Sequence, residues 1–266
     1  MRIYVMTDLE GISGVYSREQ VTQAGSRFAE GRRYMTADIN SCVEGLKAGG
    51  ADEVYVCDCH GGSYTVLWDE VTSKAEYCIS GKMPGKRFWG AEDCDGVVLL
   101  GYHAMAGTPG AVLEHSYSSK EIQNVWMNGR AIGEIGFDAA IAGEYGMPVI
   151  MVSGDDKACA EARDFLPHVT TACVKKAMSV NGAMLLPPEA AHRLIFEKAR
   201  EAVENLKNCP LFHFAKPMEC RVEVMERIQL CDPAIVPYAK ILDGRTYSVT
   251  GDSAEELFFR VFNVVR

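Results

Sequence analysis

The feature that most constrains the fold is a strand, helix, strand pattern at the start of the chain. The apolar run from Ile3 to Met6 predicts one strand, and residues 53–58 predict the next. Between them, apolar side chains recur at spacings of three and four over 33–48, which predicts an amphipathic helix that Gly49-Gly50 ends. A strand, helix, strand unit of this length is typical of a parallel sheet, so we expect an α/β protein.

The rest of the chain continues this alternation of strands and helices. Apolar runs predict further strands at 96–102, 113–117, 122–127, 148–153 and 220–225. Helical spacing predicts helices over 133–146, 156–165 and 188–206. The sequence Ser253-Ala254-Glu255-Glu256 has the capping-box pattern that would begin a last helix.

These elements predict a mixed, partly parallel sheet with flanking helices, in which two subdomains can be intertwined. Neither a linker nor a sequence repeat interrupts the 266 residues, so we treat 1–266 as one catalytic unit. A subdivision into a metal-binding part, 1–153, and a second part with a role in oligomerisation, 154–266, is the alternative.

The charge and the apolar patterning exclude several classes of partner. A net charge of −9 disfavours nucleic acid and anionic membranes, which require clustered Lys and Arg. The N-terminal segment reaches Asp8 too early for a signal peptide, and no apolar run has membrane length. We therefore expect a cytoplasmic protein whose ten cysteines are reduced. In particular, Cys57 and Cys59 lack the spacing of a zinc-binding pair and are interpreted as packing residues.

Carboxylates and imidazoles directly follow the predicted strands. Asp8 and Glu10 come after the first strand, His60 after the second and His103 after the third. Open α/β sheets place their binding sites at the carboxyl ends of strands. Asp8 and Glu10 are two residues apart, so in extended backbone both carboxylates point the same way, and a bound dication would relieve their repulsion. For this pair alone, a simple polar loop is the alternative.

Two more residues extend the set. His115 lies on the predicted strand 113–117, and Glu134 lies in the first turn of a predicted helix, where a carboxylate can also simply stabilise the helix start. Taken together, the five residues that offer carboxylate oxygen or imidazole nitrogen match the ligands of a dinuclear zinc site. They are Asp8, Glu10, His60, His103 and Glu134.

Several nearby residues have two interpretations. Asp58 can orient the His60 imidazole or close a turn. Asn128 can orient a substrate carbonyl or form an Asn-Gly turn, which the Asn-Gly sequence favours. The remaining histidines are interpreted as structural, because a single histidine is more often a hydrogen-bonded structural residue than a ligand. They are His168, His192 and His213.

These motifs, in this order, resemble those of the M55 peptidases, the D-aminopeptidase family formerly described as dipeptide transport proteins. The matching blocks are Asp8-Leu9-Glu10-Gly11, Asp58-Cys59-His60-Gly61, Gly101-Tyr102-His103, Glu114-His115-Ser116, and Asn128-Gly129 with Gly133-Glu134-Ile135-Gly136. The similarity runs from the first residue to about Ser153 and continues with weaker markers to the end of the chain.

The resemblance implies a zinc hydrolase with two zinc ions per subunit that releases N-terminal D-amino acids from short peptides, in a ring-like, decamer-like homo-oligomer. It implies that Asp8 bridges the metals, that Glu10 and His103 hold one zinc, and that His60 and Glu134 hold the other. His115 matches the catalytic position, as nucleophile, as base, or as the group that handles protons while activated water attacks.

Two positions depart from the resemblance. A small Ser-like residue is expected where this chain has Cys59, and an Asn is expected near Thr65. Neither is a proposed ligand, so the departures bear on substrate preference. The ligand set also suits a hydrolase of another amide or a phosphoester, and a non-catalytic peptide-binding or transport-associated protein is the third alternative.

Overall fold

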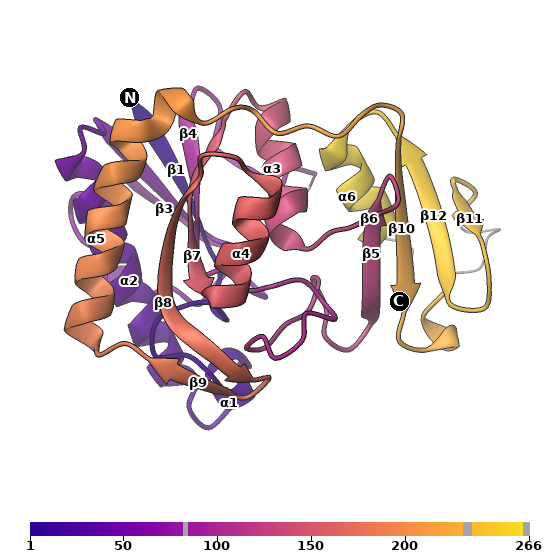
Figure 1. Ribbon diagram of the computed structural model, residues 1–266, viewed down its shortest axis with the longest axis horizontal. Coiled ribbons are helices and arrows are strands. Elements are labelled where there is room, and N and C mark those ends of the chain that lie inside the picture. The colour runs from indigo at the N-terminus through magenta and orange to yellow at the C-terminus, as the bar shows by residue number, and fades with distance from the viewer. Residues whose placement is uncertain (82–84, 231–235, 263–266) are drawn as a thin grey trace.

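A seven-stranded sheet forms the centre of the molecule in the computed structural model, which describes residues 1–81, 85–230 and 236–262 (Figure 1). The strand order is β3-β2-β1-β4-β7-β8-β9, and every neighbouring pair is parallel except β8 and β9. The strands are β1 (Arg2–Thr7), β2 (Glu53–Asp58), β3 (Tyr77–Ile79), β4 (Gly96–Leu100), β7 (Val149–Asp155), β8 (Thr170–Ser179) and β9 (Gly182–Leu185).

Helices cover both faces of this sheet because side chains alternate along each buried strand. On β1, Ile3 and Val5 pack in one core cluster with α2 (Phe28–Ala48) and α5 (Pro188–Asn205). Tyr4 and Met6 pack in a second cluster on the other face. That second cluster contains α3 (Glu134–Glu144) and α4 (Asp156–Phe165). Shorter helical segments are α1 (Arg18–Val21) and the 3₁₀ turns Trp68–Glu70, Leu206–Asn208 and Arg227–Gln229.

A second, antiparallel sheet of five strands lies beside the first, in the order β11-β12-β10-β5-β6 (Figure 1). The strands are β5 (Ile122–Met127), β6 (Arg130–Ala131), β10 (Met218–Val224), β11 (Ala239–Ile241) and β12 (Thr246–Gly251). Helix α6 (Ala254–Phe262) packs on this sheet, and residues of β5 and β10 share the core cluster of β4 and α3. Each sheet contains strands from both sides of residue 153, so the two sheets interleave along the chain. The division of the chain at that residue stays a prediction.

The α/β class and most of the predicted elements are confirmed, although the helix expected from residue 33 begins at Phe28. The strand predicted at 113–117 is wrong. Leu113 and Tyr117 have φ values of 54° and 63°, which no β-ladder accommodates, and the segment forms turns. Strands β3, β6, β8, β9, β11 and β12 were not predicted from the sequence.

The nine described cysteines are free thiols, and Cys57 and Cys59 contact the core with 3.6 Å between their sulfur atoms. In the described ranges, no helix combines the length and hydropathy needed to cross a bilayer.

Candidate active site

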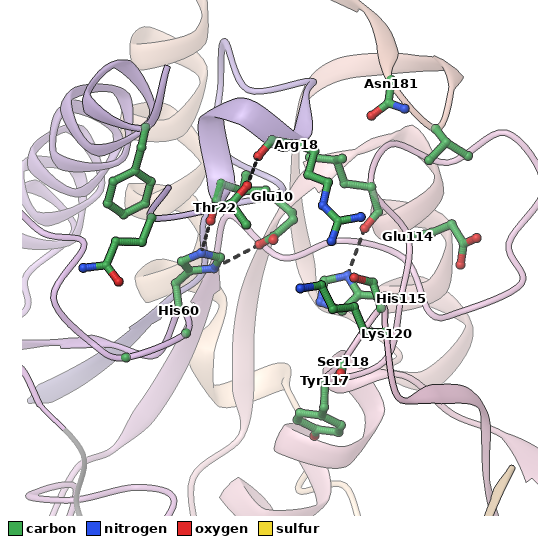
Figure 2. A pocket seen from close by; sticks show the side chains of 18 of the residues that line it. Glu10, Arg18, Thr22, His60, Glu114, His115, Tyr117, Ser118, Lys120 and Asn181 are labelled. Carbon is green, nitrogen blue, oxygen red and sulfur yellow. Dashed lines mark hydrogen bonds and ion pairs between the residues drawn. The ribbon is translucent and has the colours of Figure 1, made fainter. Parts of the chain in front are cut away.

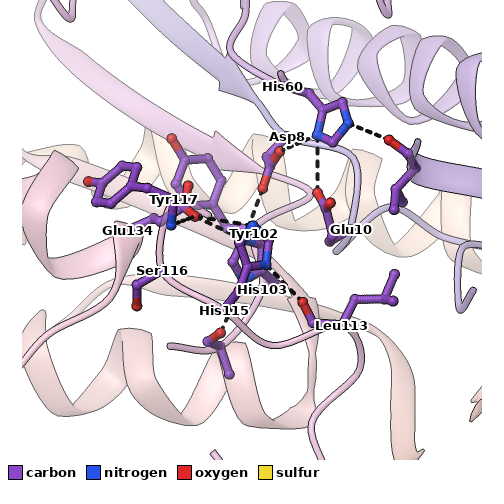
Figure 3. A network of polar contacts seen from close by, with 12 residues as sticks. Asp8, Glu10, His60, Tyr102, His103, Leu113, His115, Ser116, Tyr117 and Glu134 are labelled. Atoms are coloured by element: carbon purple, nitrogen blue, oxygen red, sulfur yellow. Dashed lines mark hydrogen bonds and ion pairs between the residues drawn. The ribbon is translucent and has the colours of Figure 1, made fainter. Parts of the chain in front are cut away.

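Parallel pairing brings the predicted site residues to one edge of the sheet. Strand β1 lies between β2 and β4, and all three run in the same direction. Asp8, His60 and His103 follow these strands, so their side chains meet beyond the carboxyl ends (Figure 3). This is where open parallel sheets place their ligands.

The loop that carries Asp8 and Glu10 is a tight turn and not the extended backbone that the sequence suggested. The Ile12 amide donates to the Leu9 carbonyl, 3.2 Å away, and the Gly11 amide donates to the Gly101 carbonyl, 2.7 Å away. A Cβ atom at Gly11 would lie 2.0 Å from the Tyr102 carbonyl oxygen, so only glycine fits there. The turn therefore fixes both carboxylates against the end of β4.

His60 contacts both carboxylates. Its Nδ1 atom lies 3.0 Å from Asp8 Oδ1 and 3.2 Å from Glu10 Oε2. Its Nε2 atom lies 2.8 Å from the Val21 carbonyl oxygen, which can only accept a hydrogen bond. Asp58 does not contact the imidazole; its carboxylate accepts from the amides of Thr65, Val66 and His60. Asp58 therefore closes the turn that positions His60, which is the second of the two interpretations given for this residue.

His103 joins Asp8 to Glu134. Its Nε2 atom lies 3.4 Å from Asp8 Oδ2 and 3.2 Å from Glu134 Oε1, while its Nδ1 atom lies 3.0 Å from the Ala104 carbonyl oxygen. Glu134 is the first residue of α3, and its Oε1 atom also accepts from the Tyr117 amide at 2.7 Å. Tyr117 has a positive φ of 63°, so the backbone is irregular at the residue whose amide contacts Glu134.

His115 stacks on His103. The two imidazole centroids are 4.0 Å apart and the rings are inclined by 10°. His115 Nδ1 lies 2.9 Å from the Leu113 carbonyl oxygen, and His115 Nε2 lies 3.7 Å from Glu134 Oε1. The carbonyl fixes the proton on Nδ1, so Nε2 is the nitrogen that can exchange a proton at the site.

The donor atoms fit a bound cation. Each of His60 and His103 uses one nitrogen on a backbone carbonyl and turns the other toward carboxylates, which is how metal-binding histidines are oriented. Among the described residues, six buried side-chain polar atoms have no hydrogen-bond partner, and three of the six belong to proposed metal ligands. These three are Asp8 Oδ2, Glu10 Oε2 and His103 Nε2. Two groups of residues could each hold a metal ion, because the donor atoms within each group lie within 4.8 Å of one another. One group is Asp8, Glu10 and His103, and the other is His103, His115 and Glu134.

The electrostatics show the same need for positive charge. Burial disfavours the imidazolium of His103, but Glu134 and Asp8 outweigh this effect and raise its pKa to about 10. Glu10 and Asp8 raise the pKa of His60 well above its ordinary value in the same way, against the effect of burial. Burial opposes the charged form of Glu10, yet His60 holds the pKa of Glu10 below its usual range. Protons on the imidazoles balance the carboxylates, and a dication would take the place of those protons.

A pocket of about 420 Å³ opens over His60 and His115 (Figure 2). Its lining includes Glu10 and Glu114 as well as two cations, Arg18 and Lys120. This volume lies at the lower end of the range for small-molecule sites. The pocket thus gives a small ligand access to the carboxylate and imidazole cluster.

The structure places the other candidate residues outside this cluster. Asn128 has a φ of 51° and Gly129 a φ of 79°, so they form the two-residue turn between β5 and β6. The Asn128 side chain bonds the Ala215 carbonyl and the Glu219 amide, away from the pocket. His192 lies 3.5 Å from Asp38 in the helical layer. The turn interpretation of Asn128 is confirmed.

Sequence reasoning missed two buried residues that support the site. Lys175, on β8, donates from Nζ to the carbonyls of Glu10, Ile12 and Val15 at 2.6, 2.9 and 2.6 Å. Glu161, on α4, accepts from the Met105 amide at 2.7 Å, and burial raises its pKa to about 7. A lysine in a strand and a glutamate in an amphipathic helix are ordinary surface residues by pattern, so no local signal marks either one.

Comparisons with known proteins identify the family of this chain. The sequence model of the peptidase M55 family, described as D-aminopeptidase, matches residues 1–264. A D-aminopeptidase of Bacillus subtilis (strain 168) is 36% identical over 206 residues, which are 77% of this chain and 74% of that protein.

A solved structure is similar over nearly the whole chain. It is the Zn-dependent D-aminopeptidase DppA from Bacillus subtilis, described as a self-compartmentalizing protease, with a TM-score of 0.92 and 30% sequence identity. The similarity covers 99% of this chain and 96% of that one. With the family match over residues 1–264, these similarities establish that the chain belongs to the M55 family of D-aminopeptidases.

Proposed function

We propose that this chain is a zinc-dependent aminopeptidase that hydrolyses short peptides from the N-terminus, in particular peptides that begin with a D-amino acid. The observation that carries the proposal is the convergence of three carboxylates and two imidazoles beside His115. Of these residues, Glu10, His60 and His115 line one pocket. The family match and the Zn-dependent D-aminopeptidase of similar structure support the metal and the substrate class.

The proposal includes two zinc ions per subunit, with Asp8 as the shared ligand. The contacts favour Asp8, Glu10 and His60 around one ion and Asp8, His103 and Glu134 around the other. This division differs from the one that the resemblance implied, because His60 pairs with Glu10. No ion pair or hydrogen bond within the described part of the chain joins His60 to Glu134. Glu10 also lies in a ligand group with His103, so the two sets adjoin.

The protein's own groups can then perform the remaining steps of peptide hydrolysis. When bound, the zinc ions would polarise the scissile carbonyl and lower the pKa of water toward neutrality. His115 Nε2 is free to take a proton and to return it to the leaving amine, since Nδ1 is fixed by the Leu113 carbonyl. Glu114, which also lines the pocket, is an acidic group that suits a charged α-amino group, as an exopeptidase requires.

We further propose a closed homo-oligomer in the cytoplasm. The structurally similar enzyme is described as self-compartmentalizing, which supports an assembly that encloses its active sites. A decamer-like ring is the form that the family resemblance implies.

Activity and metal content together test the proposal. The purified protein is loaded with zinc and assayed on D-aminoacyl amides, the matching L-aminoacyl amides and a phosphodiester. Cleavage of the D-aminoacyl amides is expected, and Glu10→Ala and His60→Ala should remove both turnover and bound zinc. Glu19→Ala, an exposed acid on α1, is the matched control. Cleavage of the phosphodiester alone, or tight peptide binding without turnover, would refute the proposal.

A further inference from the structure

Two cations line the pocket together. Arg18 belongs to α1 and Lys120 to the segment before β5, more than 100 residues apart in the chain, and both reach the same pocket. Figure 2 shows both on the side of the pocket where His115 lies, with His60 on the opposite side. The fold therefore collects two separate positive charges beside the proposed catalytic imidazole.

Neither cationic head group has a partner in the described part of the chain. Within residues 1–81, 85–230 and 236–262, the Arg18 guanidinium and the Lys120 ammonium take part in no hydrogen bond or ion pair; only their backbone carbonyls accept bonds, from Thr22 and Gln229. Eight other arginines in the described residues form ion pairs with acids, as Arg2 does with Glu53. In a chain with 36 acidic and 27 basic residues, two free cations in one pocket indicate an anionic ligand.

We propose that Arg18 and Lys120 bind the C-terminal carboxylate of the substrate, which makes free-acid short peptides the substrate class of this site. The inference rests on the proposed aminopeptidase function. A short peptide held with its scissile bond at the cluster carries one obligatory negative charge beyond that bond, its α-carboxylate. Arginine presents a planar fork that matches a carboxylate, and lysine adds a mobile point charge.

The size of the pocket limits the length of such a peptide. Each further residue moves the carboxylate about 3.3–3.6 Å outward when the peptide is extended. A pocket of about 420 Å³ holds only a small ligand, so the carboxylate of a long peptide would lie beyond the two cations. The cations would thus favour di- and tripeptides over longer chains.

Matched substrates test the proposal. We would measure kcat and KM for a D-aminoacyl dipeptide with a free C-terminus and for the same dipeptide as its C-terminal amide, using the zinc-loaded enzyme. The wild type should prefer the acid, and Arg18→Gln or Lys120→Gln should reduce the ratio of the two kcat/KM values about 10-fold each, mainly through KM. A dipeptide amide with an acidic side chain distinguishes a side-chain carboxylate from the α-carboxylate.

The controls are two exposed cations outside the pocket. Arg193→Gln and Lys207→Gln remove the same charges and should leave the acid-to-amide ratio at its wild-type value. The proposal is overturned if the wild type cleaves acid and amide equally, if the Arg18 and Lys120 variants lose both activities in parallel, or if the amide with an acidic side chain is preferred. Each of these results still requires peptide turnover, whereas no turnover of any peptide would contradict the proposed function itself.

Discussion

Replacing Lys175 by methionine should destabilise the loop that holds two of the proposed metal ligands. The Lys175 side chain is buried, with 2% of the residue exposed, and its ammonium group bonds three carbonyls between Glu10 and Val15. Methionine has a similar length but donates no hydrogen bond. The substitution therefore removes these bonds with little change in packing volume.

The magnitude follows from the carbonyls that lose their donor. The Ile12 carbonyl keeps a bond from the Val15 amide at 3.2 Å, whereas in the described residues the Glu10 and Val15 carbonyls have Lys175 alone. An unsatisfied buried carbonyl costs about 1–3 kcal/mol, so two of them cost about 2–6 kcal/mol. Burial disfavours the charged ammonium and lowers the pKa of Lys175 to about 8. Methionine carries no charge, so the substitution removes this unfavourable burial and offsets part of the cost. We expect a net loss of about 3 kcal/mol.

Guanidinium unfolding with and without zinc measures this loss. The Lys175→Met variant should have a lower free energy of unfolding and a weaker zinc affinity, because the displaced loop carries Asp8 and Glu10. Lys176→Met, at the exposed neighbouring position on β8, is the matched control and should behave as the wild type. If the variant keeps wild-type stability and zinc affinity, Lys175 does not hold the loop and this reasoning is wrong.

Three further outcomes follow from the site. Gly11→Ala should cost about 3 kcal/mol or more in thermal unfolding, because its methyl group would lie 2.0 Å from the Tyr102 carbonyl oxygen; an unchanged melting temperature would contradict this. His115→Gln should lower kcat about 100-fold or more with zinc retained, measured by kinetics beside metal analysis; full activity would remove its catalytic role. In protein stripped of metal by a chelator, the raised pKa of His103 contributes to the free energy of unfolding. This contribution is fully present below pH 6.5 and is lost as the pH rises to about 10. Unfolding free energy should fall across that window, and calorimetry should detect protons released on zinc binding; no proton release would refute the linkage.

Local patterns were sufficient to predict β1, β2, β4 and β7 of the central sheet and the edge where the ligands gather. The apolar runs at β1, β2 and β4 are buried strands, and the polar residues after them could only lie at their carboxyl ends. Helix α5, with proline in its first turn and one apolar face, was predicted within one residue of its end.

The features that could not be predicted from the sequence depend on contacts between residues that are distant in sequence. Residues 113–117 look like a strand, but their backbone turns so that the Tyr117 amide reaches Glu134. Lys175 on β8 points inward because its ammonium group donates to carbonyls of the loop that carries Asp8 and Glu10. The contact of His60 with Glu10 depends on the turn that Asp58 closes, which the spacing of motifs does not encode.

The central claim is that five side chains hold two zinc ions beside His115, and metal analysis of the purified protein tests it most directly. We predict about two moles of zinc per mole of chain in the wild type, and loss of zinc together with activity in Glu10→Ala. A fully active protein without zinc after dialysis against chelator would contradict the account.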